Sequence, residues 1–309
     1  MTHDQIIKWL LEGDMAVRYQ VQRDLLGRDD KRLRQRIEQE GWGAAFLARR
    51  REDGHWGQRY YQPKWISTHY TLMDLRNLCI SPEQVETRES VGIVIGNQIG
   101  RDGGINPSVT MPDSDVCLTG MVLNFAAYFG IEEEELGSLV DFLLIEWMKD
   151  GGFNCMSNYR GAVHSSLHTT ISVAEGIREY IRNGYKYRTK ELLEAEESCR
   201  EFMLQHRLFK SDKTGEIINK KFTMLSYPSR WFYDILRALD YFQYAGVVYD
   251  PRMDDALEVI LKKRRQDGTW PLQARHPGQT HFEMEQTGGP SRWNTLRVLR
   301  VWRHFRISG

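Results

Sequence analysis

The stretch KDGGFN, residues 149–154, ends one helical pattern and separates it from the next. Related phrases recur along the chain: EDGHWG at 52, RDGGIN at 101, KTGEII at 213 and QDGTWP at 266. Each phrase follows an amphipathic pattern, and its Asp-Gly or Thr-Gly pair predicts a tight turn that ends a helix. A polar loop and a second apolar helical pattern follow each turn. The chain is therefore predicted to be a series of helix pairs.

The second helices of these pairs can be aligned from the residue that begins each of them. The segments are STHYTLMDL, DVCLTGMVL, SLHTTISVA, SRWFYDILR and SRWNTLRVL, which start at Ser67, Asp115, Ser166, Ser229 and Ser291. Ser and Asp are preferred N-cap residues, because their side-chain oxygens accept hydrogen bonds from the first helix amides. Helix capping therefore sets the register of the alignment.

The spacing of the pairs predicts an all-α fold, an α/α toroid (α/α6 barrel) of about six helical hairpins. Residues 1–28 form an N-terminal hairpin, and residues 31–307 form five further pairs with a period of about 50 residues. Units with such a period bury their apolar faces against their neighbours. An open helical solenoid has the same periodicity, but the more apolar second helices and the long loops on one side favour a closed ring. We expect residues 1–309 to form a single domain.

Composition narrows the class of protein. The 309 residues carry 42 Lys+Arg and 42 Asp+Glu, so no net charge favours nucleic-acid binding. The first residues lack the pattern of a secretory signal, and no apolar run approaches the ~20 residues of a membrane span. The four cysteines are scattered, which is typical of a reducing compartment. We expect a cytoplasmic protein with no membrane span and no obligate protein partner.

The aligned register places potential metal ligands at one level. Two residues into the five second helices stand, in order, His69, Cys117, His168, Trp231 and Trp293. The first three are metal-ligand types, and Asp115 adds a carboxylate at the cap of the middle helix. Mixed sulfur, nitrogen and oxygen ligands in a four-coordinate site indicate zinc. We therefore predict zinc held by Asp115, Cys117 and His168.

His69 is either a fourth zinc ligand or an acid/base group, and Asp115 is a catalytic candidate as well as a ligand. Three protein ligands would leave an open, catalytic position, whereas a fourth would close the site. Each residue also has a structural interpretation. Asp115 serves as a helix cap, Cys117 as a small buried apolar residue, and His168 as a hydrogen-bonded interior imidazole.

At these residues the chain resembles the terpenoid cyclase and protein prenyltransferase toroids. DGGIN followed by DSDVCLTG, and DGGFN followed by SLHTTISVAEGI, are similar to the zinc-binding repeats of protein prenyltransferase beta subunits. The resemblance covers roughly residues 50–305 and implies that Asp115, Cys117 and His168 are the zinc ligands. It also implies a prenyl diphosphate or another anionic small molecule as substrate.

The same stretch resembles the Asp-x-Asp-Asp acid motif of squalene cyclase repeats. Asp113, Ser114 and Asp115 match its first three positions, while Val116 occupies the fourth. This resemblance implies that Asp115 is the residue that protonates the substrate. A lone Asp-x-Asp is a weaker pattern than Asp-x-Cys followed by His, so zinc is the favoured interpretation.

A repeated PSRW phrase supplies candidate substrate-binding residues. Arg230 and Arg292 are predicted to lie at helix starts, where an arginine fork suits phosphate or carboxylate. Trp231 and Trp293 offer flat apolar surfaces. Alternatively, these arginines pair with nearby acids and the tryptophans fill the core. Second-rank candidates are Tyr159, Arg160 and Tyr233, and the long segment 273–289 is expected to form a lid or rim.

Together these patterns predict a zinc-dependent enzyme, a transferase, cyclase or hydrolase, that acts on an anionic, partly apolar substrate in a central cavity. Two alternatives from other classes remain. The first is a metal-independent polysaccharide lyase or hydrolase built on a toroid. The second is a non-catalytic binding scaffold that a metal stabilises.

Overall fold

The computed structural model describes residues 1–108 and 111–307, with the side chain of Tyr159 outside the description. The chain divides into two compact units. Unit 1 comprises Met1–Arg49, Asn77–Ser81 and Leu204–Gly309, and unit 2 comprises Arg50–Arg76 and Pro82–Met203. That residues 1–309 form a single domain stays a prediction.

Unit 2 is built from three successive helical hairpins. They are α5 (Thr68–Asn77) with α6 (Val85–Gln98), α7 (Val116–Tyr128) with α8 (Glu133–Ile145), and α10 (Leu167–Arg182) with α11 (Thr189–Gln205). A short 3-10 helix, η2 (Lys64–Ile66), precedes α5, and α9 (Ser157–Arg160) lies in the loop before α10. The ends of α5 and α11 continue into unit 1.

Unit 1 holds the N-terminal and C-terminal helices. These are α1 (His3–Leu11), α2 (Met15–Gln20) extended by the π-helix η1 (Val21–Leu25), α3 (Lys31–Arg36), α4 (Gly41–Leu47), α12 (Ile235–Tyr244), α13 (Asp254–Lys262) and α14 (Arg292–Phe305). Two 3-10 turns, η3 (Lys220–Thr223) and η4 (Pro251–Met253), flank α12, and the two-residue strands β1 (Trp270–Pro271) and β2 (Pro290–Ser291) pair antiparallel.

The series of helical hairpins confirms that the chain is all-α and built from helix pairs. That the pairs close into an α/α toroid stays a prediction. The tight turns are confirmed as well. In each turn phrase the glycine directly after Asp or Thr has a positive φ, from 72° to 97°, at Gly54, Gly103, Gly151, Gly215 and Gly268. Glycine adopts this backbone conformation without the steric cost that a Cβ imposes. Within the described residues, no helix is both long and apolar enough to cross a membrane.

The predicted helix starts hold for four of the five second helices, since α5 begins at Thr68, directly after Ser67. Asp115, Ser166 and Ser291 are the N-caps of α7, α10 and α14. The start predicted at Ser229 is wrong: α12 begins at Ile235, and its N-cap is Asp234, whose side chain accepts from the Arg237 amide. Arg230 instead lies in a turn with a φ of 57°.

A buried threonine anchors four of the turn phrases to the helices that follow them. The hydroxyl oxygens of Thr119, Thr170 and Thr295 accept from the amides of Ile105, Phe153 and Trp270 at 2.8 to 3.0 Å. In the first repeat the equivalent bond joins the Trp56 amide to Thr68 at 3.0 Å. Thr119, Thr170 and Thr295 are the fifth residues of their aligned segments, whereas Thr68 is the second. The register predicted for α5 is therefore wrong by three residues, one helical turn.

Replacing the Thr170 hydroxyl should destabilise the protein. Thr170 is fully buried and both accepts from the Phe153 amide and donates to the Phe153 carbonyl. Thr170→Val keeps the side-chain shape but leaves both groups without this partner, so the free energy of unfolding should fall by about 1–3 kcal/mol. Urea denaturation measures the change. The matched control is Thr214→Val, because Thr214 accepts from the Glu216 amide at an exposed site; an equal loss in both variants would contradict the anchoring role.

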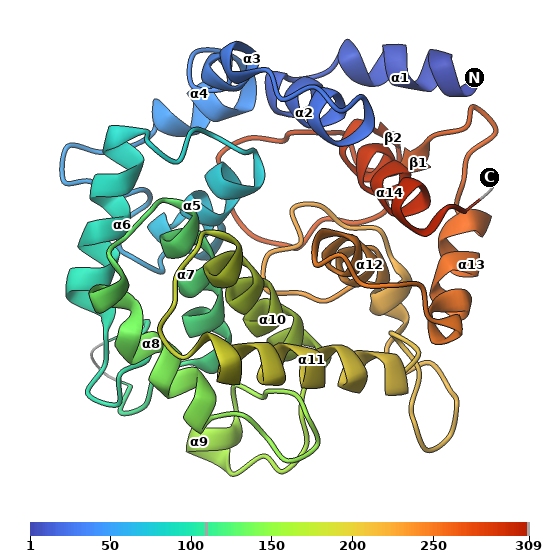
Figure 1. Cartoon of the computed structure of the whole chain (residues 1–309). Helices are drawn as coiled ribbons and strands as arrows, with labels where there is room; N and C mark the ends of the chain where they lie inside the picture. The colour runs from blue at the N-terminus through green and yellow to red at the C-terminus, as the bar shows by residue number, and fades with distance from the viewer. Residues whose placement is uncertain (109–110, 308–309) are drawn as a thin grey trace. The chain divides into compact units, whose positions relative to one another are not determined.

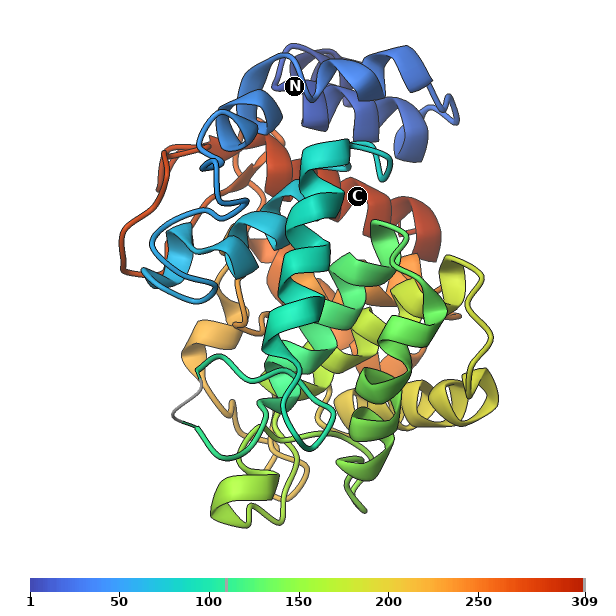
Figure 2. The ribbon, with the colours of Figure 1, turned by 90° about the vertical axis from the view of Figure 1, so that its left-hand side faces the viewer.

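The closest helix packing in unit 2 is between α7 and α10, which lie side by side (Figures 1 and 2). Two glycines permit this approach. A Cβ built on Gly176 would lie 2.2 Å from the Gly120 carbonyl oxygen, and one on Gly120 would lie 2.7 Å from the Cα of Val173. The Asn124 side-chain amide also donates to the Glu175 carbonyl at 2.9 Å. These contacts hold the starts of α7 and α10 in one register.

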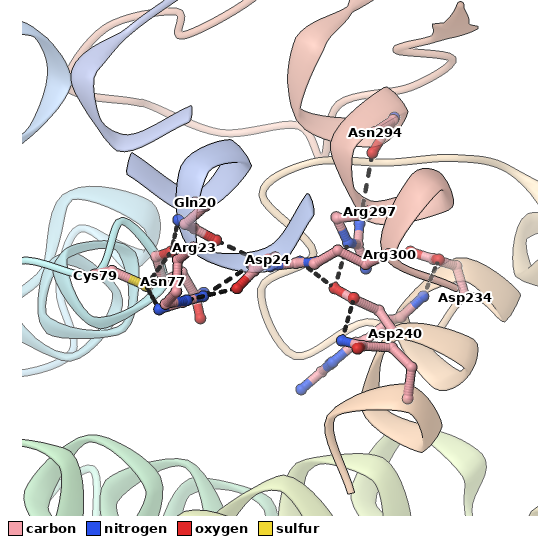
Figure 3. A network of polar contacts seen from close by, with 12 residues as sticks. Gln20, Arg23, Asp24, Asn77, Cys79, Asp234, Asp240, Asn294, Arg297 and Arg300 are labelled. Atoms are coloured by element: carbon pink, nitrogen blue, oxygen red, sulfur yellow. Dashed lines mark hydrogen bonds and ion pairs between the residues drawn. The ribbon is translucent and has the colours of Figure 1, made fainter. Parts of the chain in front are cut away.

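A buried ionic network connects the N-terminal and C-terminal helices of unit 1 (Figure 3). Arg300 of α14 bonds Asp24 at 3.0 Å and Asp240 of α12 at 2.7 Å, and Arg297 bonds Asp240 at 3.1 Å. Arg23 bonds Asp24 at 2.5 Å. Burial alone would raise the pKa of Asp24, but the charges and hydrogen bonds of Arg300 and Arg23 outweigh it and lower that pKa. The network thus stabilises the Asp24 carboxylate in its charged form.

Candidate functional site

Asp115 lies at the N-terminus of α7, where two neighbouring contacts fix the chain that carries it. The Asp115 amide donates to the Ile105 carbonyl at 2.9 Å. The adjacent Ser114 donates both its hydroxyl and its amide to Asp102 of the turn phrase, at 2.5 and 2.8 Å. The next repeat has the same arrangement, with Ser165 bonded to Asp150. The turn phrase therefore positions the helix cap.

The surroundings of the Asp115 carboxyl group raise its pKa above the ordinary value for aspartate. Its Oδ1 accepts the Leu118 amide at 2.9 Å, as an N-cap does. Asp115 is only partly accessible to solvent, and burial raises its pKa; the amides of Leu118 and Cys117 and the charge of Lys64 oppose this only in part. A raised pKa favours the protonated carboxylic acid, which can donate a proton.

Two tyrosines of unit 2 are coupled electrostatically to this carboxyl group, and one of them, Tyr60, contacts His69. The Tyr60 hydroxyl is 2.8 Å from Nδ1 of His69, and the Tyr61 hydroxyl is 3.0 Å from that of Tyr70. Burial raises the pKa of both Tyr60 and Tyr61, and the negative charge of Asp115 acts in the same direction. That coupling places both phenol groups within electrostatic range of Asp115.

His69 is a neutral, buried imidazole. Burial and the charge of Lys64 lower its pKa to about 3, so it carries no charge near neutral pH. Its Nε2 has no hydrogen-bond partner among the described residues. The corrected register of α5 places His69 directly after the anchoring threonine, one turn beyond the level of Cys117 and His168. Its predicted role as fourth ligand or acid/base group stays a prediction.

The remaining neighbours are aromatic or cationic. The Lys64 ammonium lies 5.0 Å from the Trp65 ring and 5.7 Å from the Tyr61 ring. The Trp65 and Tyr70 rings meet edge to face at 4.8 Å. Burial lowers the pKa of Lys64, while the charges of Asp115 and Cys117 oppose the change. We call Asp115 with Tyr60, Tyr61, Lys64, Trp65, His69 and Tyr70 the Asp115 cluster.

The predicted zinc ligands share part of the expected geometry. Cys117 and His168 each stand two residues before an anchoring threonine, on α7 and α10, which pack together. However, no three or more His, Cys, Asp or Glu side chains of residues 1–108 and 111–307 form a group that could hold a metal ion. The residues present therefore do not fit a zinc site in this arrangement, and zinc stays a prediction.

The predicted substrate residues of the final repeat have structural partners in unit 1. Arg292 donates through Nε to the Trp9 carbonyl at 3.0 Å, and its guanidinium lies 4.5 Å from the Trp9 ring. Trp293 is 3% exposed and stacks on Tyr227 at 4.5 Å. Both contacts agree with the structural interpretation of these two residues.

The other PSRW phrase lies at a small pocket rather than at a helix start. Arg230 lines a pocket of about 40 Å³ together with Arg275, His281 and Phe282. Such a volume is far below the ~300–1,000 Å³ of typical ligand sites. Trp231 stacks on Phe232 at 3.9 Å.

The second-rank candidates for substrate binding lie in different surroundings. Tyr233 is buried, and its hydroxyl donates to the Leu208 carbonyl at 2.5 Å, so it belongs to the core of unit 1. Arg160 is exposed at the end of α9. The side chain of Tyr159 lies outside the described part of the chain.

Several residues of the Asp115 cluster have no signal in the repeat pattern. Tyr60 and Tyr61 belong to the irregular loop after the first turn phrase, and Lys64 begins the short 3-10 helix η2 before α5. The sequence YYQPKW at 60–65 concentrates aromatic and basic residues before the helix, and this composition is the only signal that could have drawn attention to it. Glu285, one of the acids near the PSRW arginines, accepts the Arg292 amide at 2.7 Å and the Trp293 amide at 3.2 Å, which ties the 273–289 segment to α14.

Comparisons with known proteins give a structural likeness. No protein-family model matches the chain, and no curated protein matches it. Among solved structures, a variant of the type II terpene cyclase MstE from Scytonema, in complex with the product merosterolic acid A, covers 84% of this chain and 94% of its own. The two chains are 13% identical, with a TM-score of 0.29.

Proposed function

We propose that this chain is an acid-type isoprenoid cyclase in which Asp115 donates the proton that starts the reaction. The observation that carries the proposal is the partly buried Asp115 carboxyl, whose pKa is raised by burial, within an aromatic cluster. The match of Asp113, Ser114 and Asp115 to the acid motif of squalene cyclase repeats supports it. The substrate class is a linear isoprenoid with a terminal alkene or epoxide.

The chemistry requires one proton and no redox partner. Asp115 transfers its proton to the terminal alkene carbon or epoxide oxygen, which leaves a carbocation on the substrate. Neighbouring alkenes attack this cation in turn and close rings. A final proton loss returns the product to neutrality and a proton to the solvent or the carboxylate. Substrate and product are isomers.

The aromatic residues of the Asp115 cluster suit a cationic intermediate. The faces of aromatic rings attract positive charge. Trp65 and Tyr70 are buried, with exposed fractions of 5% and 0%, and Tyr61 lies beside them. Rings of this kind stabilise a carbocation without reacting as water would. His69 is neutral near pH 7, so it adds no repulsive charge.

The alternative, zinc-dependent mechanism makes an opposite prediction about metal. Purified protein dialysed against a chelator and assayed with linear polyprenyl alcohols and their terminal epoxides should give cyclic isomers, identified by mass spectrometry. We expect this activity to be the same before and after chelation. Activity that disappears with the metal and returns with zinc would contradict the proposal, as would a complete absence of cyclic products.

A further inference from the structure

A separate groove lies in unit 1, lined by residues from the start of α1 and the end of α14. Its volume is about 740 Å³, within the ~300–1,000 Å³ range of small-molecule sites. Trp270 and Trp302 line it, and their rings lie 5.5 Å apart. The rest of its apolar lining is Ile6, Leu25, Leu299 and Ile307. This surface suits an aliphatic chain, because burying it removes apolar area from water.

The charged groups that line this groove are all basic. They are Arg264, Arg303 and Arg306, with His3 beside them, and no Asp or Glu occurs among the described lining residues. Arg264 donates to the Gly268 carbonyl at 3.4 Å and Arg303 to the Asp24 carbonyl at 2.7 Å. These partners are neutral, so they leave the positive charge of the guanidinium groups uncompensated. Arginine forks bind carboxylate and phosphate groups well.

The lining also contains a polar atom that lacks a partner. Nε1 of Trp302 is buried and has no hydrogen-bond acceptor among the described residues, whereas Nε1 of Trp270 donates to the Ile260 carbonyl at 2.8 Å. Buried indole N–H groups usually have an acceptor.

We propose that this groove binds a single-chain amphiphile with an anionic head group, such as a fatty-acid-like carboxylate. The alkyl chain lies over Trp270 and Trp302, and the head group lies among Arg264, Arg303 and Arg306. The charge complementarity selects an anion, and the volume of about 740 Å³ admits one chain. The inference is independent of Asp115, which belongs to unit 2.

Titration calorimetry of the full chain with sodium decanoate, below the concentration at which it forms micelles, tests the proposal. We expect saturable binding at one site, and binding at least tenfold weaker for decyltrimethylammonium, which has the same chain and the opposite charge. The proposal is overturned if decanoate does not bind, or if the cation binds equally well.

Two variants locate the binding site. Arg303→Gln with Arg306→Gln should weaken decanoate binding at least tenfold. The control, Arg101→Gln with Lys149→Gln, removes two exposed positive charges from unit 2 and should leave binding unchanged. Leu299→Trp fills the groove from a half-buried position and should weaken binding without the loss of a charge. Equal affinity in the arginine variant and its control would place decanoate elsewhere and refute the proposal.

Discussion

Asp115→Asn is expected to lower the rate of isoprenoid cyclisation by at least about 100-fold, because general acids contribute about 10²–10⁴-fold to catalysis. An amide cannot donate the proton of a carboxylic acid, yet asparagine caps helices as well as aspartate does. The variant should therefore fold, and its circular dichroism spectrum should match that of the parent chain. Product formation from a polyprenyl epoxide, measured by mass spectrometry, gives the rate.

The stability of the Asp115→Asn variant at different pH values is a second measurement, and it tests the direction of the pKa shift of Asp115. Asp115 has a folded-state pKa raised above 3.8. Its contribution to stability therefore falls as pH rises from 3.8 through the folded-state value, because the folded chain must then bury a charge. Above that value Asp115→Asn should be at least as stable as the parent chain.

Asp113→Asn is the matched control for this variant. Asp113 is two residues earlier in the same stretch, so it tests loss of a carboxylate outside the helix cap. We expect it to keep most of the activity. Equal activity of Asp115→Asn and the parent chain would remove Asp115 from the mechanism.

Asp240→Asn is expected to lower the free energy of unfolding by about 3–5 kcal/mol, because breaking a buried ion pair leaves a charge without compensation. Asp240 bonds both Arg297 and Arg300, whose side chains are 5% and 12% exposed. The neutral amide of asparagine has the same shape but cannot balance two guanidinium charges. Urea denaturation of the full chain measures the change.

An exposed ion pair serves as the control. Asp141 bonds Arg188 at 2.7 Å, with exposed fractions of 43% and 33%. Surface pairs contribute about 0–1 kcal/mol, so Asp141→Asn should have a small effect. If the two variants lose the same free energy, the network of Figure 3 does not stabilise the chain as described.

The periodic features of the sequence predicted the fold well. The turn phrases mark helix ends because Asp-Gly and Thr-Gly pairs have few alternatives to a tight turn. Asp115 and Ser291 then cap helices through their side chains as expected, whereas Ser166 occupies the N-cap position without a side-chain hydrogen bond. Local signals of this kind can be interpreted from the sequence without knowledge of the tertiary structure.

The predicted helix starts and registers were wrong where a sequence pattern occurs more than once but the local structure does not repeat. Ser229 and Ser291 are the second residues of the same PSRW phrase, yet only Ser291 caps a helix, because Asp234 caps α12 five residues after Ser229. For α5, both Thr68 and Thr71 were available to match the anchoring threonines. The contact between Thr68 and the Trp56 amide settles the register, and the sequence cannot show that contact.

The candidate site was predicted only in part. Asp115 was found from its cap position and motif, but the burial that raises its pKa has no signal in the sequence. Burial is a tertiary property, so it could not be predicted from the position of Asp115 alone. The predicted zinc site rested on residue types at equal spacing, and the described side chains form no group that fits a metal.

Carbon-13 NMR titration of the Asp115 carboxyl tests the central claim most directly, with Asp115→Asn providing the assignment. We predict a titration midpoint above 3.8, the ordinary value for aspartate. A midpoint at or below 3.8 would show an ordinary carboxylate at a helix cap, and it would contradict the proposed role of Asp115 as the proton donor.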